Sequence, residues 1–157
     1  MMLYNALVGS CLRYSIRAWG SSSHLQNALQ SVQNKIIRAI LFLPYDSDPK
    51  PGYLELKVLN IKGIYEQEVS KLFHSVVYCY CPKSFSNFFE LSTHNYNTRL
   101  RSSSCFSLMK AKTELGKRSL RFSGVKIWAK VPISLKEIPD SKKFSKDLKR
   151  SIILHVT

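Results

Sequence analysis

The stretch from residue 110 to residue 130 interleaves basic and aromatic side chains. Its cations are Lys110, Lys112, Lys117, Arg118, Arg121, Lys126 and Lys130, and its rings are Phe122 and Trp128. Basic groups neutralise phosphates, and an exposed aromatic ring can stack on a base. The alternative is that the rings are core residues and only the cations meet solvent. We interpret Trp128 as a core residue and leave both alternatives open for Phe122.

Basic residues outside this stretch are also candidates for phosphate binding. Arg99 and Arg101 follow Asn95 and Asn97 in the string HNYNTRLR (94–101), where polar side chains can contact phosphate or sugar. The two asparagines can equally be turn residues that bond their own backbone. The choice between a phosphate contact and a plain solvated face applies also to three lysines near the C-terminus, Lys142, Lys143 and Lys146.

No pattern of residues predicts catalysis. The ten acids are thinly spread, the six glycines form no phosphate loop, and the four histidines share no ligand spacing. Cys79 and Cys81 lie near His74, but their spacing is tighter than common zinc spacings and no second ligand pair follows. We therefore predict that the chain alone is not an enzyme and holds no catalytic residue, metal or cofactor.

Charge is distributed unevenly along the 157 residues, which carry a net charge of +14. Residues 91–157 contain 15 basic and 4 acidic side chains, a net of +11, whereas residues 1–90 have a net of +3. Such asymmetry favours a polyanionic partner. The sequence shows no signal peptide, no disulfide framework and no apolar run of the roughly 18 residues that a membrane span needs. We expect an intracellular protein, nuclear or cytoplasmic and not secreted.

Apolar periodicity predicts a mainly α fold of about five helices. The clearest is 24–43, with an apolar stripe of Leu25, Leu29, Val32, Ile36, Ala39, Ile40 and Leu43. The other expected elements are helices at 2–18, 61–80, 117–130 and from 140 or 141 onward, a helical turn at 53–60, and a possible short β-hairpin near 104–113.

These elements suggest three regions: a helical pair at 1–43, a loop and third helix at 44–93, and a basic region at 94–157 that ends in an amphipathic helix. The first three helices are expected to form a small antiparallel bundle. Its predicted contacts are Leu29, Val32 and Ile36 with Leu72, Phe73 and Val76.

Five segments occur in an order that resembles a known family. They are LYNALVGSCLRYSIRAWG (3–20), LQNALQSVQNKIIRAI (25–40), HNYNTR (94–99), GKRSLRFSGVKIWAKVP (116–132) and FSKDLKRSIIL (144–154). Together they resemble the C-terminal end of reverse transcriptases of non-LTR retrotransposons of the jockey and CR1 kind, over nearly the whole chain. One departure is Val131-Pro132, where Leu-Pro is usual in the family.

The resemblance implies that the first two helices are like the polymerase thumb, which grips the template–primer duplex, and that the remainder is like the region beyond it. The family's palm, with its Asp-Asp metal site, lies upstream of this part, so no polymerase residue is carried over. The expected function is a catalytically incomplete fragment of an RNA-directed DNA polymerase that binds RNA or RNA–DNA duplex through phosphates.

Two other functions remain open from the residues. The chain could be a protein–protein or scaffold module whose apolar helix, residues 3–19, docks on a polymerase palm or on a second copy. Alternatively, the basic amphipathic helix at 141–154 could lie on a membrane surface.

Overall fold

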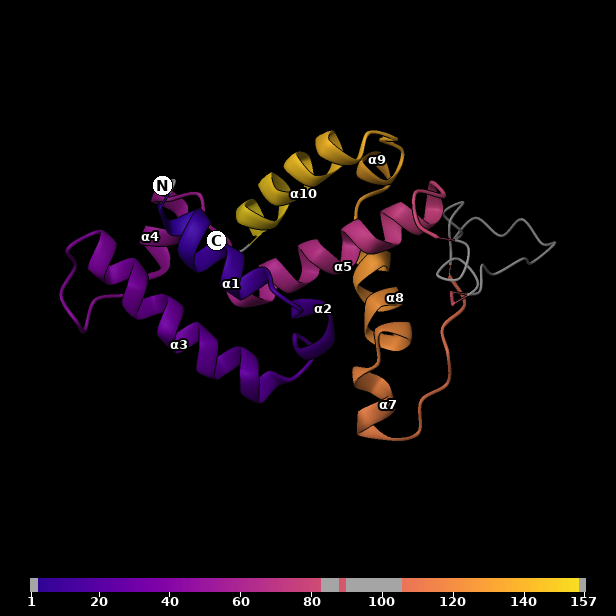
Figure 1. Ribbon diagram of the computed structural model, residues 1–157, viewed down its shortest axis with the longest axis horizontal. Coiled ribbons are helices and arrows are strands. Elements are labelled where there is room, and N and C mark those ends of the chain that lie inside the picture. The colour runs from indigo at the N-terminus through magenta and orange to yellow at the C-terminus, as the bar shows by residue number, and fades with distance from the viewer. Residues whose placement is uncertain (1–2, 83–87, 90–105, 156–157) are drawn as a thin grey trace. The chain divides into compact units, whose positions relative to one another are not determined.

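The computed structural model is helical in most of the residues that it describes, which are 3–82, 88–89 and 106–155 (Figure 1). This confirms the mainly α fold class. No strand forms within 106–113, so the hairpin expected there is absent from its described part, and residues 104–105 lie outside the described residues. The helical segments are η1 (Tyr4–Gly9), α1 (Ser10–Arg13), α2 (Ile16–Trp19), α3 (Ser23–Ile40), α4 (Lys50–Glu55), α5 (Ile61–Val77), α7 (Glu114–Arg118), α8 (Leu120–Lys130), α9 (Ile133–Lys136) and α10 (Ser141–His155).

The chain forms two compact units. Unit 1 comprises Met1–Glu68 and Leu148–Thr157, and unit 2 comprises Val69–Asp147. Helices α5 and α10 each contribute residues to both units. This division differs from the three regions expected from the sequence, because the boundaries fall inside long helices and not at the polar or proline-rich loops.

The N-terminal helix predicted at 2–18 is interrupted at Ser15, so the prediction of one continuous helix is wrong. Tyr14 is extended, and Ser15 adopts a left-handed conformation with φ of 50°. The interruption leaves the Tyr14 carbonyl without a helical partner, and the Trp19 indole Nε1 donates to it at 3.0 Å. It also sets the direction of α2, in which Ile16 is buried.

Helix α3 turns its amide side chains, and not its apolar stripe, toward the interior of unit 1. Gln33 is fully buried, and its Nε2 donates to the Tyr4 hydroxyl and to the Leu59 carbonyl, both at 2.8 Å. Ile37, one turn further on, is 0% exposed and packs in a core cluster with Tyr4 and Tyr53. The buried face of α3 is therefore centred on Gln33 and Ile37.

The apolar stripe predicted to form the bundle core is partly open to solvent. Val32 is 50% exposed, and Leu25 and Ile40 are exposed as well, so the prediction that Val32 packs in the core is wrong. Ile36 is half-buried at the edge of the unit 1 cluster. The other half of the predicted contact set is buried as expected, and it belongs to unit 2: Leu72, Phe73 and Val76.

Helix ends in this chain use residues other than glycine in the left-handed region. Phe42, Lys57 and Cys79 have φ of 53°, 50° and 55°. Each precedes a backbone N–H that bonds back to a carbonyl five residues earlier, for example Tyr80 N to Ser75 O at 2.8 Å, as in a Schellman motif. These motifs fix where the three helices end without the glycine that usually signals such an end.

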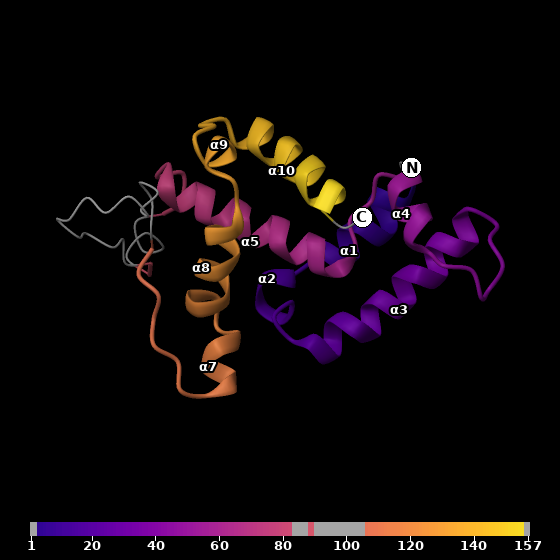
Figure 2. The same cartoon turned by 180° about the vertical axis from the view of Figure 1, so that it is seen from behind.

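Unit 2 is built around an aromatic cluster on α5. The Phe73 ring lies 4.6 Å from the Phe89 ring, 4.9 Å from Phe106 and 6.2 Å from Trp128, measured between centroids. Phe144 of α10 lies 6.1 Å from Trp128 and extends the cluster. Figures 1 and 2 both show α8 crossing α5, and the cluster lies at this crossing.

Replacing Ile37 and Val32 separately tests which face of α3 is buried. Ile37→Ala should lower the free energy of unfolding by about 2–5 kcal/mol, because it leaves a cavity in the buried core. Val32→Ala should change it by less than about 0.5 kcal/mol, because the side chain is half exposed. Urea unfolding followed by circular dichroism measures both values. The reverse ranking would restore the bundle core predicted from the sequence.

Two buried phenols make the stability of unit 1 sensitive to alkaline pH. Burial raises the pKa of Tyr4 and of Tyr53, whereas in the unfolded chain both titrate near about pH 10. The folded state keeps protons that the unfolded chain loses, so stability is complete below about pH 10 and falls above it. Tyr53→Phe should reduce the loss of unfolding free energy between about pH 8 and about pH 11. Identical pH dependence in the two proteins would contradict the burial of the Tyr53 phenol.

Candidate nucleic-acid interface

Helix α8 carries the centre of the predicted basic-aromatic stretch and is fixed by a close approach to α5. A Cβ added at Gly124 would lie 2.5 Å from Cε2 of Phe73, so only glycine fits there without a shift. One turn later, Trp128 is 2% exposed. The prediction that Trp128 is a core residue is confirmed, and the ring is not available for stacking on a base.

The opposite face of α8 carries exposed cations. Lys126 and Lys130 are exposed and lie one turn apart, away from the face of Gly124 and Trp128. Lys126 places its Nζ 4.2 Å from the centre of the Phe122 ring, and that ring is half-buried. The Phe122 ring is therefore partly covered by the Lys126 side chain. This position is intermediate between a buried core residue and an exposed ring that can stack on a nucleobase.

Arg121 differs from the other cations of the stretch because it packs into unit 2. Its guanidinium carbon lies 4.0 Å from the centre of the Phe88 ring. Its Nε is buried and has no hydrogen-bond partner among the described residues. A guanidinium held against a ring in this way contributes to packing by a cation–π contact. Arg121 thus packs this part of α8 against the Phe88 ring, with less of its charge open to a phosphate.

Helix α7 and the segment before it present a second group of cations. Thr113 caps α7, accepting from the Gly116 N–H at 3.1 Å. Lys117 pairs with Glu114 at 2.6 Å, and this hydrogen bond and charge hold the pKa of the Glu114 carboxyl below its ordinary value. Both side chains are exposed, so the pair competes only weakly with a phosphate. Three more cations are exposed here: Arg118, Lys110 and Lys112.

The beginning of α10 is positioned by side chains from the end of α5. His74 Nε2 lies 2.7 Å from the Ile138 carbonyl and donates to it, because a carbonyl can only accept. The Tyr78 hydroxyl donates to the Lys136 carbonyl at 2.9 Å. The His74 ring also stacks on Phe144, with centroids 4.2 Å apart. These contacts bury one face of α10, and its exposed face carries Lys142, Lys143 and Lys146.

The structure therefore places every described candidate in unit 2. Eight of them are exposed, namely Lys110, Lys112, Lys117, Arg118, Lys126, Lys142, Lys143 and Lys146, and Arg121 is packed on a ring. Arg99 and Arg101 lie outside the described residues. One cation not chosen from the sequence, Lys136, is buried with its Nζ 5.4 Å from the Trp128 ring centre. Nothing in its sequence context, ISLKE, distinguishes it from a surface lysine.

Clusters typical of other kinds of site are absent from the described ranges. In 3–82, 88–89 and 106–154, no three His, Cys, Asp or Glu side chains are grouped as metal ligands. Cys79 is exposed, and the Cys81 thiol lies 3.5 Å from the Ser75 carbonyl. None of the described helices is long and apolar enough to span a membrane.

Substituting two glycines tests the close packing of α8. Gly124→Ala should lower the unfolding free energy by about 1–3 kcal/mol, because the new methyl group meets a buried ring. Gly9→Ala is the matched control, since the nearest atom to its Cβ is 3.6 Å away and the backbone is helical. That change should leave stability unchanged or raise it by up to about 1 kcal/mol. Equal stability of the two variants in urea unfolding would contradict the packing of α8 on α5.

The chain has no match among protein-family models, curated proteins or solved structures. The candidate interface is defined by its geometry alone. Its helices are fixed by aromatic packing, and its exposed cations lie on the faces turned away from that packing. Such an arrangement suits backbone phosphates, which are bound by charge at an open surface and need no cavity.

Proposed function

We propose that the chain binds RNA or an RNA–DNA duplex through backbone phosphates, as a catalytically incomplete part of a retroelement RNA-directed DNA polymerase. The observation that carries the proposal is the set of exposed cations on α7, α8 and the beginning of α10. Residues 91–157 hold 15 basic against 4 acidic side chains, and one of those acids, Glu114, is already paired with Lys117. The excess charge is therefore available to an external polyanion.

The local folding supports phosphate contacts better than base recognition. Trp128 is buried and Phe122 lies beneath Lys126, so neither ring is a free stacking platform. Lysines on helix faces reach phosphates without a fixed geometry, whereas base recognition needs bidentate groups held in place. Binding that depends on charge and is tolerant of sequence follows from this set of side chains.

The resemblance supports the polymerase context of the proposal. The block GKRSLRFSGVKIWAKVP (116–132) includes Gly124 and Trp128, which pack α8 onto α5, and Lys126 and Lys130, which remain exposed. One motif thus supplies both the packing that holds the helix and the charge that it presents. We assign no catalytic role to any residue.

A second function, docking on a protein partner, is favoured by the N-terminal segment. Leu3, Leu7 and Tyr14 are 76%, 66% and 77% exposed. Leu7 lies in η1, Leu3 immediately precedes η1, and Tyr14 immediately follows α1. Covering exposed apolar side chains of this size with a partner removes them from water, which lowers the free energy and favours binding. The partner in this alternative is a polymerase palm or a second copy of the chain.

Binding to a labelled RNA–DNA hybrid at increasing salt concentrations tests the proposed function. Affinity should fall steeply with salt, because phosphate contacts release counterions. Lys126→Gln together with Lys130→Gln should reduce the slope of log K against log salt by about 1 to 2. The control Lys57→Gln with Lys62→Gln removes the same charge from exposed positions of unit 1 and should leave the slope nearly unchanged.

Two results of this experiment would oppose phosphate binding by unit 2. Absence of binding at low salt would mean that the cations form only a solvated face. Equal effects of the two lysine pairs would mean that net charge, and not the α8 face, sets the affinity. A salt-independent dimer that Leu7→Asp disrupts, together with absence of nucleic-acid binding, would favour the docking function instead.

A further inference from the structure

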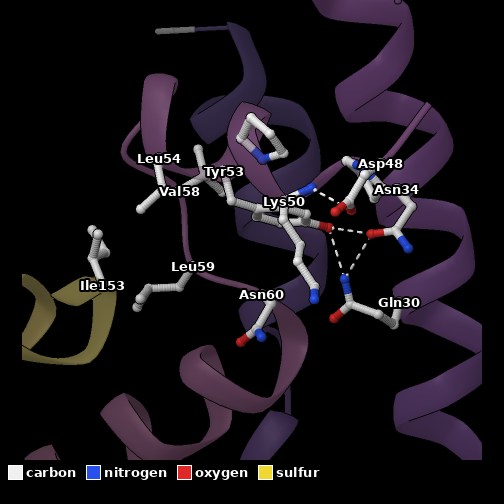
Figure 3. Close-up of a pocket in the computed structure, with 12 residues that line it drawn as sticks. Gln30, Asn34, Asp48, Lys50, Tyr53, Leu54, Val58, Leu59, Asn60 and Ile153 are labelled. Atoms are coloured by element: carbon white, nitrogen blue, oxygen red, sulfur yellow. Dashed lines mark hydrogen bonds between the residues drawn. The ribbon is translucent and has the colours of Figure 1, made fainter. Parts of the chain in front are cut away.

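The polar face of α3 borders two adjoining hollows, both within unit 1. The first is about 560 Å³ and is lined by Gln30, Asn34 and Tyr53 together with residues of the 48–60 segment and Ile153 (Figure 3). The second is about 500 Å³, and it shares Gln30 and Asn34 with the first. The two hollows therefore meet at these amides, and one ligand can occupy both.

The first hollow has apolar walls. Leu54, Val58, Leu59 and Ile153 line it, and Figure 3 shows them on the opposite side of Tyr53 from Asn34. A volume of this size lies in the range of sites for small organic ligands. Apolar walls suit the faces of a flat heterocycle, which is poorly hydrated compared with a phosphate or a sugar.

A hydrogen-bonded triangle forms the polar side of this hollow. Gln30 Nε2 donates to the Tyr53 hydroxyl at 2.7 Å and to Asn34 Oδ1 at 2.9 Å, and Tyr53 donates to the same Oδ1 at 2.7 Å (Figure 3). Gln30 Oε1 is taken by the Ile61 N–H at 3.0 Å. These bonds fix the orientation of the Asn34 amide. Its nitrogen has no partner among the described residues and points away from Tyr53 in Figure 3, so two N–H donors remain for a ligand.

The second hollow is lined by groups that suit a sugar and a phosphate. Lys35 is exposed on its border, and Arg38 lies beside it with its guanidinium carbon 5.9 Å from the Tyr45 ring centre. Ser31 and Asn27 add hydrogen-bonding groups, and Asp46 can accept from a ribose hydroxyl. In the first hollow, Lys50 is exposed, and in Figure 3 its side chain runs past the Tyr53 ring.

We propose that these two hollows bind one unstacked nucleotide of single-stranded RNA, with the base in the apolar hollow and the adjoining phosphate beside Lys35 and Arg38. Asn34, at the junction, donates to the base edge or to the sugar. The proposal rests on the proposed function for the choice of RNA as ligand, but it assigns this contact to residues of unit 1, whereas the lysines of α8 belong to unit 2. A base paired within a duplex cannot enter the hollow, so the site distinguishes single strands from duplexes.

The test exchanges the donor edge of Asn34 and keeps its acceptor. Asn34→Asp leaves an oxygen for Tyr53 and Gln30 but puts a carboxylate oxygen in place of the free amide nitrogen. Ala28→Asp is the matched control, because it adds the same charge at an exposed position of α3 that borders neither hollow. The probes are labelled single-stranded RNA of about eight nucleotides and an RNA–DNA hybrid, followed by fluorescence anisotropy.

Asn34→Asp should weaken single-strand binding by roughly tenfold or more, because an N–H donor is replaced by a carboxylate that has the same negative charge as the RNA phosphates. It should change hybrid binding no more than Ala28→Asp does. Lys50→Gln should also weaken single-strand binding, whereas Lys62→Gln should not. Because Lys50 is exposed and its side chain makes no hydrogen bond within the described residues, this second variant avoids a failure to fold. Circular dichroism melts verify that each variant is folded.

Equal single-strand affinities of folded Asn34→Asp and Ala28→Asp would overturn the nucleotide site. If the Lys126 and Lys130 pair still controlled hybrid binding in that case, the proposed function would stand without it. A third result is that Asn34→Asp loses single-strand binding while Lys126→Gln with Lys130→Gln has no effect on hybrid binding. This result would support the nucleotide site and contradict phosphate binding by unit 2.

Discussion

Burial of the Gln33 amide is the constraint on which the rest of unit 1 depends. Its Nε2 bonds to the Tyr4 hydroxyl and the Leu59 carbonyl, and these partners come from two different segments of unit 1. A buried amide that lost its partners would cost about 1–3 kcal/mol, so the three segments are held in one arrangement. With Gln33 inside, α3 has no freedom to rotate about its axis. That orientation leaves the apolar stripe of α3 partly exposed and places its polar side chains along the two hollows.

The positions of the main helices could be predicted from the sequence, whereas the orientation of α3 could not. Apolar spacing predicts α3, α5 and α10 because each is a long helix with apolar residues recurring on one face. The same spacing predicts that the apolar face is buried. It fails when a buried polar side chain is hydrogen-bonded by residues distant in sequence, as the Gln33 Nε2 is by Tyr4 and Leu59. Those partners become known only from the fold.

Left-handed backbone conformations at residues other than glycine also cannot be predicted from the sequence. Ser15 and Phe42 adopt the left-handed region that glycine usually occupies, so the interruption before α2 and the end of α3 carry no mark in the sequence. In the candidate interface, Trp128 was predicted correctly because a tryptophan at helical spacing with other apolar residues favours burial. The packing of Arg121 on the Phe88 ring has no signal in the sequence, because the two residues are far apart along the chain.

The nucleic-acid contacts proposed for the two units depend on different physical interactions. In unit 2, aromatic packing around Phe73 fixes α8, and the cations are what remains on its outer face. Charge of this kind gives affinity without selectivity, because every phosphate is equivalent. In unit 1, the hydrogen-bonded amides of Gln30 and Asn34 are rigid and border a hollow with apolar walls. Fixed donors in such a hollow can discriminate between ligands, because a ligand that leaves them unpaired loses the free energy of their hydration.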